Sequence, residues 1–142
     1  MKLAMLCLLL LGNAPANPTP APRDAGSAVA ETSVASVTSA SGRLRVEVLS
    51  SATPLRRGVQ RFHIRVTEAA TGRAVPGVEL AVLPWMPSMG HGIDGNPRIT
   101  VLGPGDFEVS DLDLFMPGAW ELRLTLTGKV DDKAVVPLKL AR

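Results

Sequence analysis

Three methionines and one histidine fall in two turn-forming segments, WMPSMGHG (85–92) and FMPG (115–118): they are Met86, Met89, His91 and Met116. Methionine usually fills gaps inside a core, at strand or helix periodicity. The prolines and glycines of both segments break such periodicity. Soft thioether sulfurs beside an imidazole suit Cu(I) better than zinc, and they suit calcium least. The pattern therefore predicts a copper site in which all four residues are ligands.

Two questions about these segments remain open at the sequence level: whether the methionines bind a metal, and what Trp85 does. The methionines can instead pack over the end of a core, as adaptable apolar side chains do. Trp85 either lies with its ring face over a cation or covers the end of the core. Gly90 and Gly92 flank His91 and give the backbone freedom to turn the ring towards a metal.

The N-terminal residues have the pattern of an export signal. Lys2 supplies a positive charge, an apolar run follows at 3–11, and 14–16 is a small-residue cleavage sequence. The run is far shorter than the ~20 residues of a membrane-spanning helix, although a short N-terminal anchor is an alternative. We therefore predict a signal peptide at 1–16, no transmembrane segment in the mature chain, and a periplasmic or secreted location.

Cysteine chemistry is absent from the predicted mature chain. The single cysteine, Cys7, lies inside the signal peptide, so neither a disulfide nor a thiolate metal site can form after cleavage. Any soft metal ligand must then be a methionine. Residues 17–42 are rich in Pro, Ala and Ser, which predicts a flexible linker. Val34 and Val37 allow a weak extra strand within it.

From residue 43 to residue 142, apolar and polar residues alternate with a period of two. The clearest run is 120–126, and Pro137 favours an edge position for the last strand. About seven short strands separated by turns predict an all-β, immunoglobulin-like antiparallel β-sandwich. Because strand-end loops of a sandwich gather at its two ends, the two methionine segments can meet there.

Composition argues against two other classes of function. The net charge is only +2 and the basic residues are scattered, so we expect no nucleic-acid partner. No recognisable nucleophile motif occurs, and the chain has only two histidines, so we expect no enzyme. His63 is predicted on an outward strand face. The acidic pairs at 111/113 and 131/132 are interpreted as solvated turn charges.

The methionine segments also carry a family resemblance. LPWMPSMGHG (83–92), followed by FMPGAWEL (115–122), resembles the YtkA-like domain and is similar to the periplasmic part of FixH-type proteins. The resemblance covers about residues 43–140. It implies an immunoglobulin-like sandwich outside the cytoplasm, associated with copper handling or copper-oxidase assembly. The motif positions of the family fall on the same four residues: Met86, Met89, His91 and Met116.

The predicted function is an exported, non-enzymatic copper-binding domain. It would hold Cu(I) in a shallow site and buffer it, or pass it by ligand exchange to a copper-receiving envelope protein or oxidase. FixH-type proteins carry an N-terminal membrane helix, whereas this chain has a short export signal and a linker, so a soluble form fits better. The rival is a metal-free interaction module whose methionine loops contact a partner. An accessory role in an export or efflux assembly is compatible with either.

Overall fold

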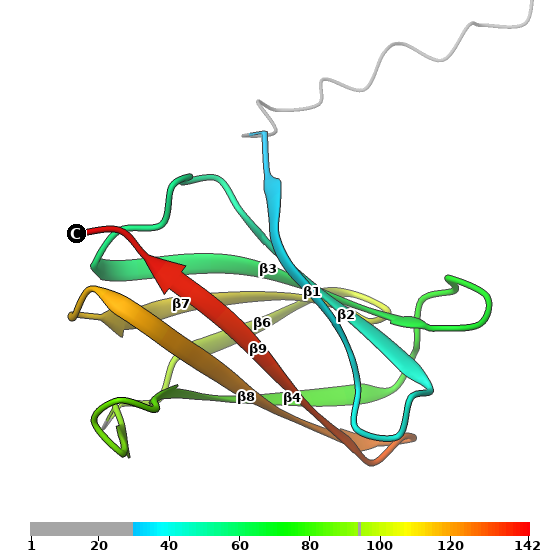
Figure 1. Ribbon diagram of the computed structural model, residues 1–142. Coiled ribbons are helices and arrows are strands. Elements are labelled where there is room, and N and C mark those ends of the chain that lie inside the picture. The colour runs from blue at the N-terminus through cyan, green and yellow to red at the C-terminus, as the bar shows by residue number, and fades with distance from the viewer. Residues whose placement is uncertain (1–29, 94) are drawn as a thin grey trace, which may run out of the picture.

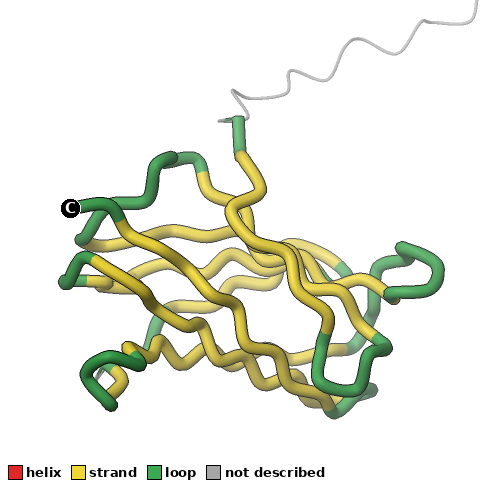
Figure 2. Tube along the Cα trace, viewed as in Figure 1, coloured by secondary structure: helices red, strands yellow, loops and turns green. Residues whose placement is uncertain are grey.

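The computed structural model describes residues 30–142 except residue 94, and these fold into nine strands arranged as two antiparallel sheets (Figures 1 and 2). The strands are β1 (Thr32–Thr38), β2 (Leu44–Ser50), β3 (Gly58–Glu68), β4 (Val78–Met86), β5 (His91–Gly92), β6 (Arg98–Gly103), β7 (Asp106–Leu114), β8 (Gly118–Gly128) and β9 (Asp132–Leu140). None of the described residues belongs to a helix that could span a bilayer. The predicted signal peptide at 1–16 lies outside the described residues.

The strand order confirms the immunoglobulin-like sandwich. One sheet has the order β1-β2-β3-β7-β6 and the other has the order β5-β4-β8-β9. Without β1 and β5, the two orders match the ABED and CFG sheets of a constant-type immunoglobulin domain. In that comparison β4 is strand C and β8 is strand F. The last strand, β9, lies at a sheet edge with Pro137 exposed, as the sequence predicts.

Two strands go beyond the seven that the sequence predicts. Strand β1 lies within the stretch 17–42 that was interpreted as a linker, so the folded region begins before residue 43. Its Ser and Ala residues have little intrinsic preference for a strand, but pairing with β2 supplies backbone hydrogen bonds, and Val34 and Val37 pack against the core. Strand β5 has two residues and closes the hairpin that follows β4.

The core lies between the two sheets and contains the inward side chains of every long strand. The largest fully buried side chains are Trp120, Phe62 and Phe107, at no more than 1% exposure. Trp120 is in phase with Leu122 and Leu124 on β8, as the period of two predicts. Burial of apolar surface at roughly 25 cal/mol per Å² holds the sheets together without a disulfide between them.

A buried carboxylate ties two turns together at one end of the sandwich. Asp132 accepts hydrogen bonds from the backbone N–H and the hydroxyl of Ser41, and from the backbone N–H of Lys133. These contacts join the β1–β2 turn to the start of β9. The interpretation of Asp132 as a solvated turn charge is therefore wrong, because only 9% of the residue is exposed. Its neighbour Asp131 is exposed, as expected.

Candidate metal centre

The first methionine segment forms the turn of the β4–β5 hairpin. Met86 ends β4, and its carbonyl accepts hydrogen bonds from the backbone N–H groups of Met89 and Gly90, at 3.1 and 3.0 Å. The chain then reverses, so that His91 pairs directly with Met86 across the hairpin. Opposite residues in an antiparallel pair lie on the same face of the sheet with their Cβ atoms about 5 Å apart. The hairpin thus brings one thioether and the imidazole together.

The second methionine segment, between β7 and β8, reaches the same place. The Cε of Met86 lies beside the backbone of Gly118, 3.6 Å from where a Cβ at that position would stand. The indole N–H of Trp120 donates to the carbonyl of Met116 at 2.8 Å and fixes the segment over the core. Figure 1 shows the β4–β5 hairpin and the β7–β8 connection at the same end of the sandwich. All four predicted ligands are therefore carried by two neighbouring segments.

The four side chains differ in their access to solvent. Met86 is 4% exposed and belongs to the hydrophobic core, while Met116 is half-buried against it. Met89 is 52% exposed at the hairpin tip, and His91 is exposed beside it. The structure therefore assigns a packing role to Met86, as one sequence alternative proposed. Met89, in contrast, does not belong to the core cluster.

The tautomer of His91 is set by its own strand. Its Nδ1 lies 3.0 Å from the carbonyl oxygen of Gly92, and because a carbonyl only accepts, Nδ1 carries the proton. In the neutral imidazole with this tautomer, the lone pair is on the other ring nitrogen, Nε2. A backbone carbonyl on one ring nitrogen commonly orients a histidine that binds a metal through the other. The residues present thus fit a soft metal with one nitrogen ligand.

Trp85 does not cover the end of the core. Side chains alternate along a strand, so Trp85 is on the outer face of β4 while Met86 points inward. The guanidinium carbon of Arg123 lies 4.2 Å from the centre of its ring. Arg123 also contacts Glu121 at 3.2 Å. The cation over one face of the indole is therefore an arginine of the same chain.

An open hollow of about 750 Å³ lies beside His91. Its walls include the outer face of β4, at Leu83 and Trp85, and Phe115 from the other methionine segment. Leu83 and Phe115 are 45% and 47% exposed. The ring of Phe115 meets that of Trp120 edge to face, with centroids 6.0 Å apart. His91 therefore stands at the border of an apolar surface, and Met89 is exposed at the tip of the same hairpin.

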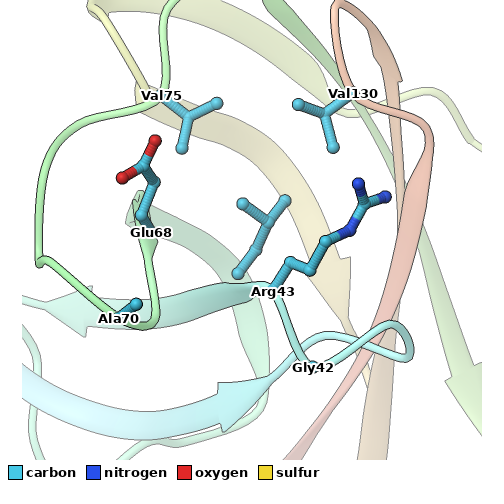
Figure 3. Close-up of a pocket in the computed structure, with 7 residues that line it drawn as sticks. Gly42, Arg43, Glu68, Ala70, Val75 and Val130 are labelled. Atoms are coloured by element: carbon cyan, nitrogen blue, oxygen red, sulfur yellow. The ribbon is translucent and has the colours of Figure 1, made fainter.

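Other polar groupings in the described part of the chain are structural. His63 is on the outer strand face, as predicted, but its ring nitrogens contact Glu31 and Asp106 at 2.8 and 3.3 Å. A hollow of about 430 Å³ at the opposite end lies between Arg43 and Glu68 over apolar side chains (Figure 3). Within residues 30–142, with 94 left aside, no three His, Cys, Asp or Glu residues group as a metal site.

Comparison with known proteins places the chain in a family. The YtkA-like family model matches residues 38–125, which is more than half of the chain. This chain belongs to the YtkA-like family. The match includes both methionine segments and ends within β8. Comparison with the curated proteins finds no match.

One solved structure with the same architecture is a copper-bound variant of FetP from uropathogenic Escherichia coli strain F11. The two structures superpose with a TM-score of 0.52 at 7% sequence identity, over 79% of this chain and 93% of that chain. At this identity the similarity shows the fold alone. It agrees with a two-sheet sandwich and assigns no residue of this YtkA-like chain to a metal.

Sequence reasoning placed the two methionine segments but missed what surrounds them. Nothing in the period of two indicated that Arg123 would lie over Trp85, because the two residues come from different strands. The register of the β4–β8 pair, in which Trp85 is opposite Glu121, brings the arginine into reach. The alternation itself was a usable signal, since it predicts that Trp85 and Met86 point to opposite faces.

Proposed function

We propose that this YtkA-like chain is an exported, non-enzymatic copper-binding domain that holds Cu(I) through Met86, Met89, His91 and Met116. The observation that supports this most directly is the arrangement of the hairpin. His91 faces Met86 across the β4–β5 pair and keeps Nε2 free, while Met116 arrives from the neighbouring connection. Three thioethers and one imidazole nitrogen are a soft donor set, and Cu(I) is the biological ion that such a set suits best.

The difference in burial suggests how such a site would work. Met86 and Met116 belong to the wall of the core and form the inner side, which is largely closed to water. Met89 and His91 form the outer side and are accessible to another protein. A copper-receiving envelope protein or oxidase can approach these outer ligands and replace them one at a time. Buffering and delivery would both use this exchange.

The decisive test is a thermal melt of the protein under anaerobic conditions, with and without Cu(I). A ligand that binds only the folded state stabilises it by about 2.7 kcal/mol at one hundred times its dissociation constant. For a domain of this size that corresponds to an increase in Tm of about 10 °C. The same experiment with Zn²⁺ should give little change, because thioethers are poor zinc ligands.

Variants separate metal binding from packing. Met89→Leu should leave the apo Tm almost unchanged and remove most of the copper shift. Met86→Leu combined with Met89→Leu removes two of the proposed thioether ligands and should abolish the shift. The variant should still fold, since the swap from Met to Leu keeps the volume of the core. Leu83→Ala, at an exposed position of the same hairpin, is the matched control and should keep the full shift. If Cu(I) moves neither the wild type nor the control, the copper proposal fails.

The hollow beside His91 supports a second candidate, a metal-free interaction module. Leu83 and Phe115 line the hollow and are exposed, and Met89 is exposed at the tip of the same hairpin, so a partner protein can cover all three. Methionine adapts its shape to different contacts. Partner binding that is equal with and without copper would favour this candidate, whereas copper-dependent binding would favour delivery of the metal.

A further inference from the structure

The edge of the four-stranded sheet is open along most of β4. Strand β5 pairs with Trp85 and Met86 only, whereas β8 pairs with β4 from Val78 to Trp85. Along the open part, β4 therefore has a strand on one side and none on the other among the described residues. A row of backbone groups at a sheet edge is a template for another strand.

The hydrogen bonds show which backbone groups are exposed there. The carbonyls of Pro84 and Met86 accept bonds from residues of the hairpin, at 3.3 and 3.1 Å, so both point away from β8. Residues two apart on a strand direct their backbone groups to the same side. Leu80 and Val82 therefore also direct their N–H and C=O groups to the open edge. Within residues 30–142, with 94 left aside, the N–H and C=O groups of Leu80 and Val82 form no backbone hydrogen bond.

The space beside this edge is also apolar. The side chains of Leu80 and Val82 pack against the core but are only partly buried. On the other sheet, Val101 of β6 is paired with the buried Phe107 and so points to the interior, yet it is 67% exposed. Strand β1 lies against β9 on the opposite side of the sandwich, so β4 and β6 are the free edges of one side. Among the described residues, only the two-residue β5 continues the four-stranded sheet beyond β4 on this side.

We propose that the open edge of β4 is a docking site for an extended segment of a partner polypeptide, which pairs with Leu80 and Val82 as an added strand. Variable-type immunoglobulin domains fill the place next to strand C with a strand of their own chain. Here β4 corresponds to strand C, and only the two residues of β5 occupy that place. Main-chain hydrogen bonds supply the affinity in this mode of recognition, and side-chain pockets supply the specificity.

The surroundings define the chemistry of the segment. Its inward residues lie beside Leu80 and Val82 and beneath Val101, so they are apolar and recur at every second position. An outward residue lies beside Glu79, which is exposed on β4, and the carboxylate favours Lys or Arg there. The segment is therefore a short strand of alternating apolar and polar residues with one basic side chain.

Two occupants from this chain itself fit less well. The stretch 17–29 consists mainly of Pro, Ala, Gly, Ser and polar residues, with Val29 as its only large aliphatic side chain, so it does not supply apolar residues at every second position. A second copy paired through β4 would place both five-stranded sheets on the same side of the joined sheet. Because β4 approaches β7, β6 of each copy would then overlie the β4 of the other and collide with its β7. A single segment avoids this collision.

The test uses the full protein and a seven-residue peptide, acetylated and amidated, with valine at positions two, four and six and lysine at position three. Backbone NMR should show shifts at Leu80 and Val82 on titration, and their amides should become protected from hydrogen exchange. Val82→Pro removes one edge N–H without breaking the β4–β8 ladder, so it should weaken peptide binding by about tenfold or more.

The matched control is Val135→Pro, at the edge of β9. The carbonyl of Lys133 accepts a bond from Ala40, so odd-numbered residues of β9 point away from β8, and Val135 does not donate to it. This variant should bind the peptide like the wild type. Equal weakening by both prolines, or peptide shifts centred away from β4, would overturn the proposal.

Charge and self-association give two further outcomes. Glu79→Lys should weaken binding of the lysine peptide by about threefold and improve binding of the same peptide with glutamate, which supports the register. The variant leaves the backbone edge intact, so it remains informative even if Val82→Pro unfolds. If sedimentation shows a dimer that Val82→Pro converts to a monomer, a second copy fills the edge and the proposal of a separate partner is overturned.

Discussion

Asp132 provides the sharpest test of the energetics of this fold. Burial by itself would raise the pKa of its carboxyl group. Hydrogen bonds from the hydroxyls of Ser39 and Ser41, and from the backbone N–H groups of Lys133 and Ser41, outweigh burial and lower the pKa from 3.8 to about 2. The folded protein therefore favours the carboxylate, and the carboxylate in turn favours the folded protein. The perturbation we consider is Asp132→Asn.

The direction of the pH dependence follows from the lowered pKa. The stabilisation is fully present above the unfolded value of 3.8, and it is lost as the pH falls through the folded value of about 2. The difference between these two pKa values corresponds to about 2 kcal/mol. Asp132→Asn should therefore lower the free energy of unfolding by about 2 kcal/mol at pH 7, and by much less near pH 2, where about half of the native carboxyl groups are protonated.

Urea unfolding of wild type and variant between pH 2 and pH 7 measures this difference. Asp131→Asn is the control, because its exposed neighbouring side chain should change the free energy of unfolding by less than about 0.5 kcal/mol. A loss that stays constant over the whole pH range would refute the reasoning, since it would show a packing effect without a contribution from charge. An equal loss in Asp131→Asn would refute it as well.

Three further predictions concern the site and its frame. Met86→Ala should destabilise the apo protein by about 3 kcal/mol in urea unfolding, because it leaves a cavity in the core. Met89→Ala should cost less than about 0.5 kcal/mol, because its side chain is exposed. Similar losses in both variants would contradict the different burial of the two methionines. Gly105→Ala should cost more than about 2 kcal/mol by thermal unfolding, because the residue has φ +68° and a Cβ would overlap the backbone carbonyl oxygen of Val66. A neutral result would show that the turn adapts. A double-mutant cycle of Arg123→Met and Trp85→Leu should give a coupling of about 0.5–1 kcal/mol, and additivity would show that the contact adds nothing.

Much of the fold was predictable because it depends on local alternation. In β8 the apolar residues Trp120, Leu122 and Leu124 repeat every two residues, and this pattern alone assigns one face to the core. The edge position of Pro137 follows from its missing N–H. For strand β1 the sequence predicted a linker with a weak extra strand only as an alternative, because the stretch around it has linker composition and its pairing with β2 is a tertiary contact.

The candidate metal site was predictable in part. The types and positions of Met86, Met89, His91 and Met116 depend only on the sequence, and so does their placement in turns. The different degrees of burial of these four side chains do not follow from the sequence alone, because burial arises only when the two sheets pack against each other. Met86 became a core residue since the inward face of β4 meets the five-stranded sheet, while Met89 stayed at the hairpin tip in contact with solvent.

By itself the sequence determined the class of the fold, the absence of cysteine from residues 8–142 and the soft donor set, because each is a property of residue type and spacing. The tertiary structure decided which elements meet. The β4–β5 register placed His91 opposite Met86, and the β4–β8 register brought Arg123 over Trp85. It also left the edge of β4 open, because strand pairing joins residues far apart in the chain and no local pattern records where the last strand of a sheet ends.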